Sequence, residues 1–471
     1  MKILFATSEA VPFVKSGGLA DVSGSLTRAL RTRRQSCRVV MPLYADIPRQ
    51  DREKMKFITS FEVPLSWRKQ YCGVFETSVN GVKYYLLDNE YYFHRHGIYG
   101  FYDDAERFAF FSRAILEMVE HIDFEPDIIH CNDWQTALVP VYLNVFYRHR
   151  DRLRNIKTVF TIHNIQYQGI YGTDIAGDVL GLPSPAVGIV EYGGNVNLMK
   201  GALEEAEAIT TVSPSYAVEI MDPWFAHGID PILREKQYKL TGILNGLDYQ
   251  DYDPETDDKI IQHYSAKDPA GKAVNKRELQ RSLRLEQDPD AMVIGMVGRL
   301  VGHKGLDLVQ YALEHIMREG VQFVLLGAGD WQYEKFFREA VPNYPGRLSV
   351  TLGFDDVLAR KIYSGADVFL MPSKSEPCGL SQMIALRYGT IPVVRATGGL
   401  KDTVIDLGGD NGNGYNFLTY NADDMLYALD RAFAGFADKE GWAENVKAAM
   451  KCDFSWGNSA NAYIALYKGL L

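Results

Sequence analysis

The segment MVIGMVGRLVGHKGLDLVQYALEHIMR, residues 292–318, carries the pattern that decides the fold. It opens with an apolar run, Met292–Val297, that has the length of a buried strand. A glycine-rich loop follows (Gly298–Gly305), and Leu306–Arg318 then places apolar residues at helical spacing. A strand that leads through a short loop into a helix is the repeating unit of a parallel sheet covered by helices.

The same unit recurs in both halves of the chain, which predicts two doubly wound α/β domains. The other expected strands are Lys2–Ser8, Cys37–Met41, Asp127–His130, Lys157–His163, Ala208–Val212, Gln322–Gly327, Leu348–Leu352, Asp367–Met371 and Ile391–Arg395. Asn80-Gly81, a strong hairpin signal, separates Tyr71–Val79 from Val82–Asp88 and predicts antiparallel strands within the first series. Ligands of such sheets bind beyond the carboxyl ends of the strands.

The chain is also too long for one domain. Hydrophobic cores stop growing near about 250–300 residues, and this chain has 471. Residues 245–276 are polar and rich in turn-forming residues, so we expect them to connect two domains. The expected parts are an N-terminal Rossmann-like domain with a hairpin insertion around 57–88 (1–244), the connection (245–276), a C-terminal Rossmann-like domain (277–455), and a last helix whose packing side stays open (456–471).

The composition limits the class of protein. The charge balance of 50 Lys and Arg against 60 Asp and Glu, a net −10, argues against nucleic acid as the main partner. No apolar run reaches the length of a membrane helix, and the apolar start of the chain is too short for a signal peptide. Five scattered cysteines without a CxxC motif indicate a cytoplasmic protein with no cysteine-based metal site.

Two glycine pairs follow strands and open helices. Ser16-Gly17-Gly18-Leu19 in the first half is echoed by Thr397-Gly398-Gly399-Leu400 in the second. Such a pair exposes backbone N–H groups at a helix start, where the helix dipole favours an anion, and Lys15 adds a cation to the first pair. Either pair alone fits a plain glycine turn, but the recurrence favours a ligand site.

Polar residues follow other strands. Arg299 and Lys304 suit a diphosphate, although they also fit two solvated cations, and no Walker or GxGxxG motif occurs. Glu376, before a Pro-x-Gly turn, could orient sugar hydroxyls or simply cap a helix. The clusters around His163-Asn164 and Asp133-Trp134 suit a polyol, the alternative being satisfied core residues. No spacing resembles a zinc site.

In combination these residues resemble bacterial glycogen synthases and plant starch synthases. The resemblance runs in order from Met1 to Phe454-Ser455-Trp456 and rests on Lys15–Leu19, His163-Asn164, Asn245-Gly246-Leu247-Asp248, Arg299 with Lys304, Glu376–Leu380 and Thr397–Leu400. It implies the GT-B fold, two Rossmann-like domains facing a deep cleft. It also implies retaining transfer of glucose from ADP-glucose to the non-reducing end of an α-1,4-glucan, such as glycogen or a maltooligosaccharide, without metal or cofactor.

The resemblance also implies the roles of single residues. The catalytic set is His163, Glu376, Arg299 and Lys304. The donor-binding set is Lys15, Gly17, Gly18, Asn164, Asn245, Phe354, Cys378, Gly379, Leu380, Thr397, Gly398 and Gly399. The acceptor-binding set is Asp133, Trp134 and Asp21. Three other functions stay open: a transferase with a UDP-sugar or another acceptor, an inactive glucan-binding protein, and a two-domain binding protein, which the missing signal peptide disfavours.

Two positions depart from the family pattern. Wider retaining GT-B enzymes often carry a second Glu eight residues after the first, where this chain has Ile384. Members also usually have a Gly in the turn at Arg31–Arg38, and this chain has none. We expect local strain or a different turn there, because a left-handed residue after a helix is most easily a glycine.

Overall fold

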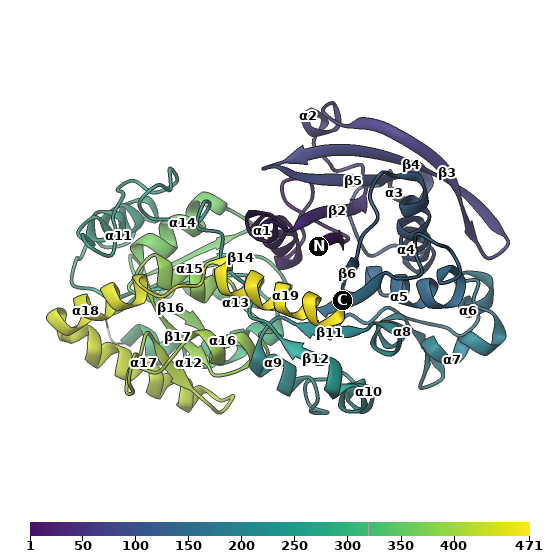
Figure 1. Cartoon of the computed structure of the whole chain (residues 1–471). Coiled ribbons are helices and arrows are strands. Elements are labelled where there is room, and N and C mark those ends of the chain that lie inside the picture. The colour runs from purple at the N-terminus through teal and green to yellow at the C-terminus, as the bar shows by residue number, and fades with distance from the viewer. Residues whose placement is uncertain (319) are drawn as a thin grey trace. The chain divides into compact units, whose positions relative to one another are not determined.

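The computed structural model describes residues 1–318 and 320–471. The chain divides into two compact units (Figure 1). Unit 1 comprises Met1–Gly246 together with Trp456–Leu471, and unit 2 comprises Leu247–Ser455. The last helix, whose side the sequence left open, therefore belongs to unit 1.

Unit 1 is built on a nine-stranded sheet with the order β12-β11-β7-β6-β1-β2-β5-β4-β3. The strands from β12 to β5 are parallel, whereas β4 pairs antiparallel with both β5 and β3. The bounds are β1 (Lys2–Ala6), β2 (Ser36–Pro42), β3 (Lys56–Leu65), β4 (Arg68–Val79), β5 (Val82–Asp88), β6 (Ile128–Asn132), β7 (Lys157–Ile162), β11 (Ala208–Thr211) and β12 (Leu240–Gly242). A small antiparallel sheet consists of β8 (Ile170–Tyr171), β10 (Asn195–Asn197) and β9 (Glu191–Tyr192).

Unit 1 also contains α-helices. They are α1 (Gly18–Thr32), α2 (Arg49–Arg52), α3 (Glu90–Phe93), α4 (Asp104–His121), α5 (Leu138–Tyr142), α6 (Ile175–Asp178), α7 (Val187–Val190), α8 (Leu198–Glu205), α9 (Pro214–Glu219), α10 (Asp230–Glu235) and α19 (Trp456–Leu470). The terminal helix α19 packs beside α1 (Figure 1). Its Tyr467 hydroxyl lies 2.6 Å from Nδ1 of the buried His130, which fixes the helix to β6.

Unit 2 has one parallel sheet with the order β15-β14-β13-β16-β17-β18. Its strands are β13 (Val293–Val297), β14 (Gln322–Gly327), β15 (Leu348–Leu352), β16 (Val368–Met371), β17 (Ile391–Arg395) and β18 (Tyr415–Phe417). Its helices are α11 (Gly271–Ser282), α12 (Leu306–Arg318), α13 (Trp331–Ala340), α14 (Asp356–Gly365), α15 (Ser381–Arg387), α16 (Gly398–Thr403), α17 (Ala422–Ala437) and α18 (Lys439–Met450). Both units are thus doubly wound, as the sequence predicts.

The predicted strands begin and end within three residues of the observed ones, and β4 and β5 form the predicted hairpin at Asn80-Gly81. Two details differ. The hairpin extends the main sheet, because β5 also pairs in parallel with β2. The pattern also missed the edge strand β3, the three strands of the small sheet, and the edge strands β12 and β18, whose three residues are too few for a periodicity.

The turn after α1 shows how a helix ends here without glycine. Arg34 adopts φ 62°, a left-handed conformation that costs a residue with a Cβ about 1–2 kcal/mol. Its N–H donates to Arg31 O at 2.9 Å and that of Gln35 donates to Leu30 O at 3.1 Å, the two bonds of a Schellman motif. Of the two expected outcomes, strain is the one observed.

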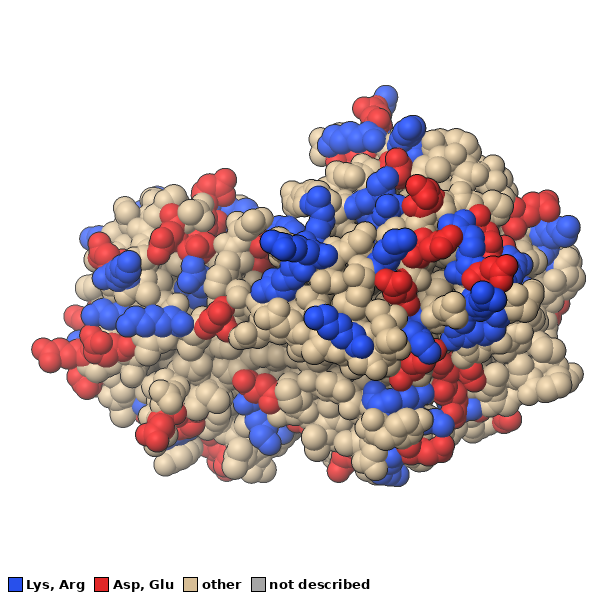
Figure 2. Space-filling view, viewed as in Figure 1, with Lys and Arg blue, Asp and Glu red and all other residues tan. Residues whose placement is uncertain are grey.

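The surface carries charges of both signs. On the face drawn in Figure 2, acidic and basic side chains are interspersed over both units. Within residues 1–318 and 320–471, no helix is long and apolar enough to cross a membrane.

Each main sheet has one switch point, where the chain changes the side of the sheet on which it adds strands. In unit 1 the chain leaves β1 toward β2 on one side and returns to β6 on the other. In unit 2 it leaves β13 toward β14 and returns to β16. At such a switch point the loops after the two neighbouring strands diverge, and a ligand site opens between them.

Candidate active site

The switch point of unit 2 holds an ion pair. Lys304 follows β13, Glu376 follows β16, and Lys304 Nζ lies 2.6 Å from Glu376 Oε2. The Glu376 side chain is 9% exposed and that of Lys304 is 22% exposed. Ser373 Oγ also donates to Oε2, at 3.1 Å, whereas no described residue hydrogen-bonds to Oε1. The pair therefore keeps one carboxylate oxygen for a ligand.

The loops that carry this pair are locked to each other. The backbone N–H of Lys374 donates to His303 O at 2.8 Å. Gly305 has φ 76°, and a Cβ there would lie 2.1 Å from Pro372 O, so only glycine fits between the loops. Arg395, at the end of β17, donates Nε to Ser373 O at 2.9 Å. The Lys304–Glu376 distance is thus set by the backbone and not by the two side chains alone.

The second glycine pair braces the same loop. Gly398 has φ 44°, and a Cβ there would lie 2.0 Å from Glu376 O. A Cβ on Gly399 would lie 2.0 Å from Cys378 O, and the Gly399 N–H donates to Glu376 O at 3.0 Å. The N–H groups of Thr397 and Leu400 also donate within this segment. The glycines let this turn pack directly on the backbone that carries Glu376.

The other residues predicted for the donor have different environments. Arg299 is exposed, and its side chain makes no ion pair or hydrogen bond with any described residue. Phe354, after β15 and Gly353, is 89% exposed. Cys378 is buried, Gly379 has φ 71° with Gln382 beside it, and Leu380 precedes α15. Ile384, at the departure noted above, is 5% exposed. Asn245, which belongs to unit 1, is buried with Oδ1 unpartnered.

The first glycine pair, in unit 1, has a different environment. The backbone N–H groups of Ser16 and Gly17 donate to the carboxylate of Glu9, which is 3% exposed. Burial raises the pKa of Glu9 despite these bonds. Lys15 Nζ lies 2.8 Å from Asp21 Oδ1, with side chains 42% and 28% exposed. The sequence did not single out Glu9, although an acid shortly after a buried strand and before a glycine turn was the available signal.

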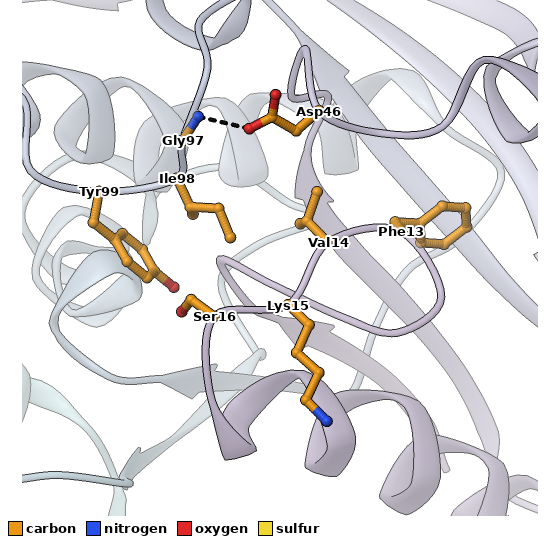
Figure 3. Close-up of a pocket in the computed structure, with 8 residues that line it drawn as sticks. All are labelled: Phe13, Val14, Lys15, Ser16, Asp46, Gly97, Ile98 and Tyr99. Atoms are coloured by element: carbon orange, nitrogen blue, oxygen red, sulfur yellow. Dashed lines mark hydrogen bonds between the residues drawn. The ribbon is translucent and has the colours of Figure 1, made fainter. Parts of the chain in front are cut away.

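A pocket of about 530 Å³ opens beside this turn (Figure 3). It is lined by Phe13, Val14, Lys15, Ser16, Asp46, Gly97, Ile98 and Tyr99. Asp46 holds one wall, because its carboxylate accepts from Gly97 N at 2.6 Å and contacts His96 Nδ1 at 2.8 Å. In Figure 3 the Lys15 side chain points away from Tyr99 and along α1.

In unit 1, Asp133 follows β6, which borders the switch point, and His163 follows the next strand of the sheet, β7. Asp133 has φ 56°, a strained conformation for a residue with a side chain. Its Oδ1 accepts from His163 N at 2.8 Å, and the N–H of Asn164 donates to the same carboxyl. Burial raises the pKa of Asp133 to about 7 and lowers that of His163 to about 3. The predicted residues Asp133, His163 and Asn164 therefore join the loop after β6 to the loop after β7.

Trp134 and Asn132 flank this turn. Trp134 is 9% exposed, and its ring packs against Phe108 at 5.1 Å and Tyr171 at 6.1 Å between centroids. Asn132 Oδ1 lies 2.9 Å from His163 Nε2, a contact that sequence reasoning did not assign. Among the described residues, no group of three His, Cys, Asp or Glu side chains could hold a metal ion.

Comparisons with known proteins agree along the whole chain. Residues 2–235 match a family model described as the starch synthase catalytic domain, and residues 276–449 match glycosyl transferases group 1. A protein of Desulforamulus reducens named glycogen synthase is 49% identical over 475 residues, covering 100% of this chain and 99% of that protein.

Two solved structures are similar to this chain along its whole length. The catalytic domain of starch synthase IV from Arabidopsis thaliana, bound to ADP and acarbose, superposes with a TM-score of 0.91 at 33% identity. The match covers 100% of this chain and 99% of that one. A sucrose-phosphate synthase from Thermosynechococcus elongatus has a TM-score of 0.63 at 18% identity, with 100% and 98% covered, and shares the fold.

Proposed function

The chain belongs to the glycogen synthase and starch synthase family of glycosyltransferases, and we propose that ADP-glucose is its donor and an α-1,4-glucan its acceptor. Its fold is the GT-B fold of that family. The reaction proposed is transfer of glucose to the non-reducing end of the glucan, with retention of the anomeric configuration. The ADP and acarbose bound to the Arabidopsis relative support a nucleotide donor and a glucan acceptor.

The observation that carries the proposal is the Lys304–Glu376 pair beside the free cation Arg299. As the bond to the donor glucose breaks, negative charge grows on the departing diphosphate and positive charge on the anomeric carbon. The two cations stabilise the diphosphate, and preorganised charge of the kind that Lys304 supplies is usually the largest catalytic contribution. Because Lys304 is held by its partner and by the locked loops, it needs little reorganisation in the transition state.

Glu376 is proposed to orient the donor sugar. Its Oε2 is occupied by Lys304 and Ser373, while Oε1 can accept from a sugar hydroxyl. The exposed ring of Phe354 is proposed to stack on the base of the nucleotide. Donor binding by Lys15, Gly17, Gly18, Asn164, Asn245, Cys378, Gly379, Leu380, Thr397, Gly398 and Gly399, and acceptor binding by Asp21, Asp133 and Trp134, stay predictions.

Retention of configuration needs a path other than the glycosidase double displacement. The sequence offers no evident nucleophile and acid pair of that kind. We therefore propose that the acceptor hydroxyl attacks on the face from which the diphosphate leaves. The leaving phosphate oxygen takes the acceptor proton, so the C1–O bond to phosphate breaks as the C1–O bond to the acceptor forms.

The test is a donor panel with product analysis. The purified chain is given ADP-, UDP- or GDP-glucose, with and without a maltooligosaccharide primer and with chelator added. We expect primer-dependent release of ADP, undiminished by chelator, and α-1,4 linkages in the product by NMR. Preference for UDP-glucose would reassign the donor, and β-anomeric signals would contradict retention. No incorporation from any donor would favour an inactive glucan-binding protein.

A further inference from the structure

Asn132, the last residue of β6, is buried with 1% of its surface exposed and contacts His163 at the end of the neighbouring strand β7. Asn132 Nδ2 donates to Ala6 O at 2.9 Å and to His130 O at 3.3 Å. Carbonyl oxygens only accept, so the NH₂ group has to face them and Oδ1 has to face His163. The orientation of this amide is therefore determined by its backbone partners.

The amide in turn determines the state of the imidazole. His163 Nε2 lies 2.9 Å from Asn132 Oδ1, so Nε2 has to carry the proton that donates to it. Burial lowers the pKa of His163 to about 3, and the ring is neutral at pH 7 with a single N–H. Nδ1 then bears a lone pair, and no described residue donates to it.

Among the described residues, the nearby titratable groups make no hydrogen bond to Nδ1 of His163. Asp133 accepts from the backbone N–H of His163 and Asn164 and makes no bond to the imidazole. On β6, His130 uses both ring nitrogens elsewhere, at 2.6 Å from Tyr467 OH and 2.6 Å from Thr161 Oγ1. The free acceptor thus stands next to a turn that the protein keeps in a strained conformation.

We propose that Asn132 is a positioning residue for the transfer reaction, which holds the His163 ring in one orientation and in the Nε2–H tautomer so that Nδ1 accepts from a hydroxyl of the reacting sugar. The inference rests on the proposed function, because the family resemblance behind that function assigns His163 to the catalytic set. Without Asn132 the ring can turn about its Cβ–Cγ bond, which exchanges Nδ1 with a carbon that accepts nothing.

The first test needs no substrate. Long-range ¹H–¹⁵N spectra of the wild-type chain resolve the tautomer of each of its 10 histidines, and His163→Gln identifies the signals of His163. We expect a protonated Nε2 and an unprotonated Nδ1 that persist from pH 8 down to about pH 5. A protonated Nδ1, or averaged signals for the two nitrogens, overturns the proposal.

The second test is kinetic. Asn132→Leu keeps the volume but removes the acceptor, and we expect kcat to fall about tenfold, the worth of one hydrogen bond, with a smaller change in donor KM. The matched control is Asn275→Leu in unit 2, because Asn275 is 3% exposed and binds only backbone groups. The control should lose stability but not kcat. Equal kcat losses in the two variants would make Asn132 a merely structural residue.

A third variant restores the acceptor alone. Asn132→Asp offers an oxygen to Nε2–H but no donor to Ala6 O, so it should keep more kcat than Asn132→Leu while being no more stable. Its carboxylate also raises the pKa of His163, because an opposite charge favours the imidazolium. The imidazolium has no lone pair, so kcat of this variant should fall as the pH is lowered. The wild type should show no such fall. A flat profile would contradict the assigned role.

The donor itself distinguishes this inference from the proposed function. With a series of monodeoxy ADP-glucoses, one missing hydroxyl should cost the wild type about tenfold in kcat and cost Asn132→Leu much less, because the partner is already misplaced. Transfer by the wild type without such coupling would overturn the inference alone. A wild type that transfers glucose from no donor would overturn the proposed function together with this role.

Discussion

The two glycine turns, Ser16-Gly17-Gly18 in unit 1 and Thr397-Gly398-Gly399 in unit 2, read alike in sequence but are built differently. In unit 1 the N–H groups of Ser16 and Gly17 donate to the buried carboxylate of Glu9, and Gly17 has an extended φ of −158°. In unit 2, Gly398 is left-handed and lies against the backbone of Glu376. One turn is closed by an internal anion, whereas the other holds a loop in place.

The difference teaches that a glycine pair at a helix start is not by itself an anion site. The same signal serves wherever backbone N–H groups need a partner or two backbones approach closely. In unit 2 the charges that can meet a diphosphate are the side chains of Arg299 and Lys304. The glycines support the loop that carries Glu376. The predictions below test this division of roles.

The largest effect is expected at the two cations of unit 2. Lys304→Ala and Arg299→Ala should each lower kcat/KM by about 10²–10³, the usual loss on removing one preorganised charge at a transition state. The control is Lys335→Ala, which removes a cation from the exposed Lys335–Glu339 pair of the same unit, 3.9 Å apart. Steady-state ADP release measures all three. Loss of activity in the control, or normal activity in both cation variants, would place the diphosphate elsewhere.

The second prediction compares the glycines directly. Gly398→Ala should lower the free energy of unfolding by about 3 kcal/mol or more, because φ 44° is unfavourable and the new Cβ would lie 2.0 Å from Glu376 O. Gly17→Ala should change it by less than about 0.5 kcal/mol, because its Cβ would meet only Glu9 Oε1 at 3.9 Å. Denaturant unfolding gives both values, and equal losses would refute the contrast drawn here.

The third prediction concerns Lys15, which is already paired with Asp21. If it also meets the donor phosphate, Lys15→Gln should weaken donor binding by roughly ten- to a hundredfold, since a charge-assisted hydrogen bond contributes about 1.5–3 kcal/mol. Glucan affinity should change less. Lys54→Gln is the matched control, because Lys54 pairs with Asp51 at 2.9 Å on the same unit. A normal donor Kd in Lys15→Gln would mean that Lys15 pairs with Asp21 of α1 and does not contact the donor.

A somewhat smaller effect is expected for Phe354. Stacking of a base on an aromatic ring is worth about 1–3 kcal/mol, so Phe354→Ala should raise the donor KM several-fold or more without a large change in kcat. Truncation should cost little stability because the ring is 89% exposed. Tyr311→Ala, at an 80% exposed aromatic of the same unit, controls for general surface effects. An unchanged donor KM would mean that Phe354 does not stack on the base.

The smallest effect is expected at the end of α1, where glycine is missing. Arg34→Gly should stabilise unit 1 by about 1 kcal/mol, because it relieves the left-handed residue at φ 62°. Arg34→Ala serves as control and should bring no gain, since alanine has the same backbone penalty. Thermal unfolding of both variants measures the difference. A loss of stability in Arg34→Gly would mean that the Arg34 side chain makes a contact that outweighs the strain.

Much of this architecture could be predicted from sequence, because buried parallel strands read as short apolar runs with helical patterns between them. The switch-point residues Arg299, Lys304 and Glu376 were found for the same reason, since they follow such runs directly. Short edge strands such as β18 carry no readable period, and the sequence did not show that β5 joins the sheet beside β2.

Which residues of different loops contact each other could not be predicted from the sequence. The bonds from Ser16 to Glu9 and from His163 to Asn132 depend on which loops meet in three dimensions. The sequence predicts acceptor binding by Trp134 but does not show that the residue is 9% exposed and that its ring packs on Phe108. A residue type and its place after a strand give the chemistry available there, but burial and partners decide how that chemistry is used.

The most direct test of the account is the rate of ADP release from ADP-glucose, with a maltooligosaccharide primer, for Glu376→Gln beside Glu339→Gln. Both changes neutralise a carboxylate that pairs with a lysine of unit 2, at 2.6 Å in the candidate site and at 3.9 Å on the surface. We predict a fall in kcat of about 10²–10³ for Glu376→Gln and no more than a twofold change for Glu339→Gln. Near-normal turnover in Glu376→Gln would contradict the placement of the reaction at the switch point of unit 2.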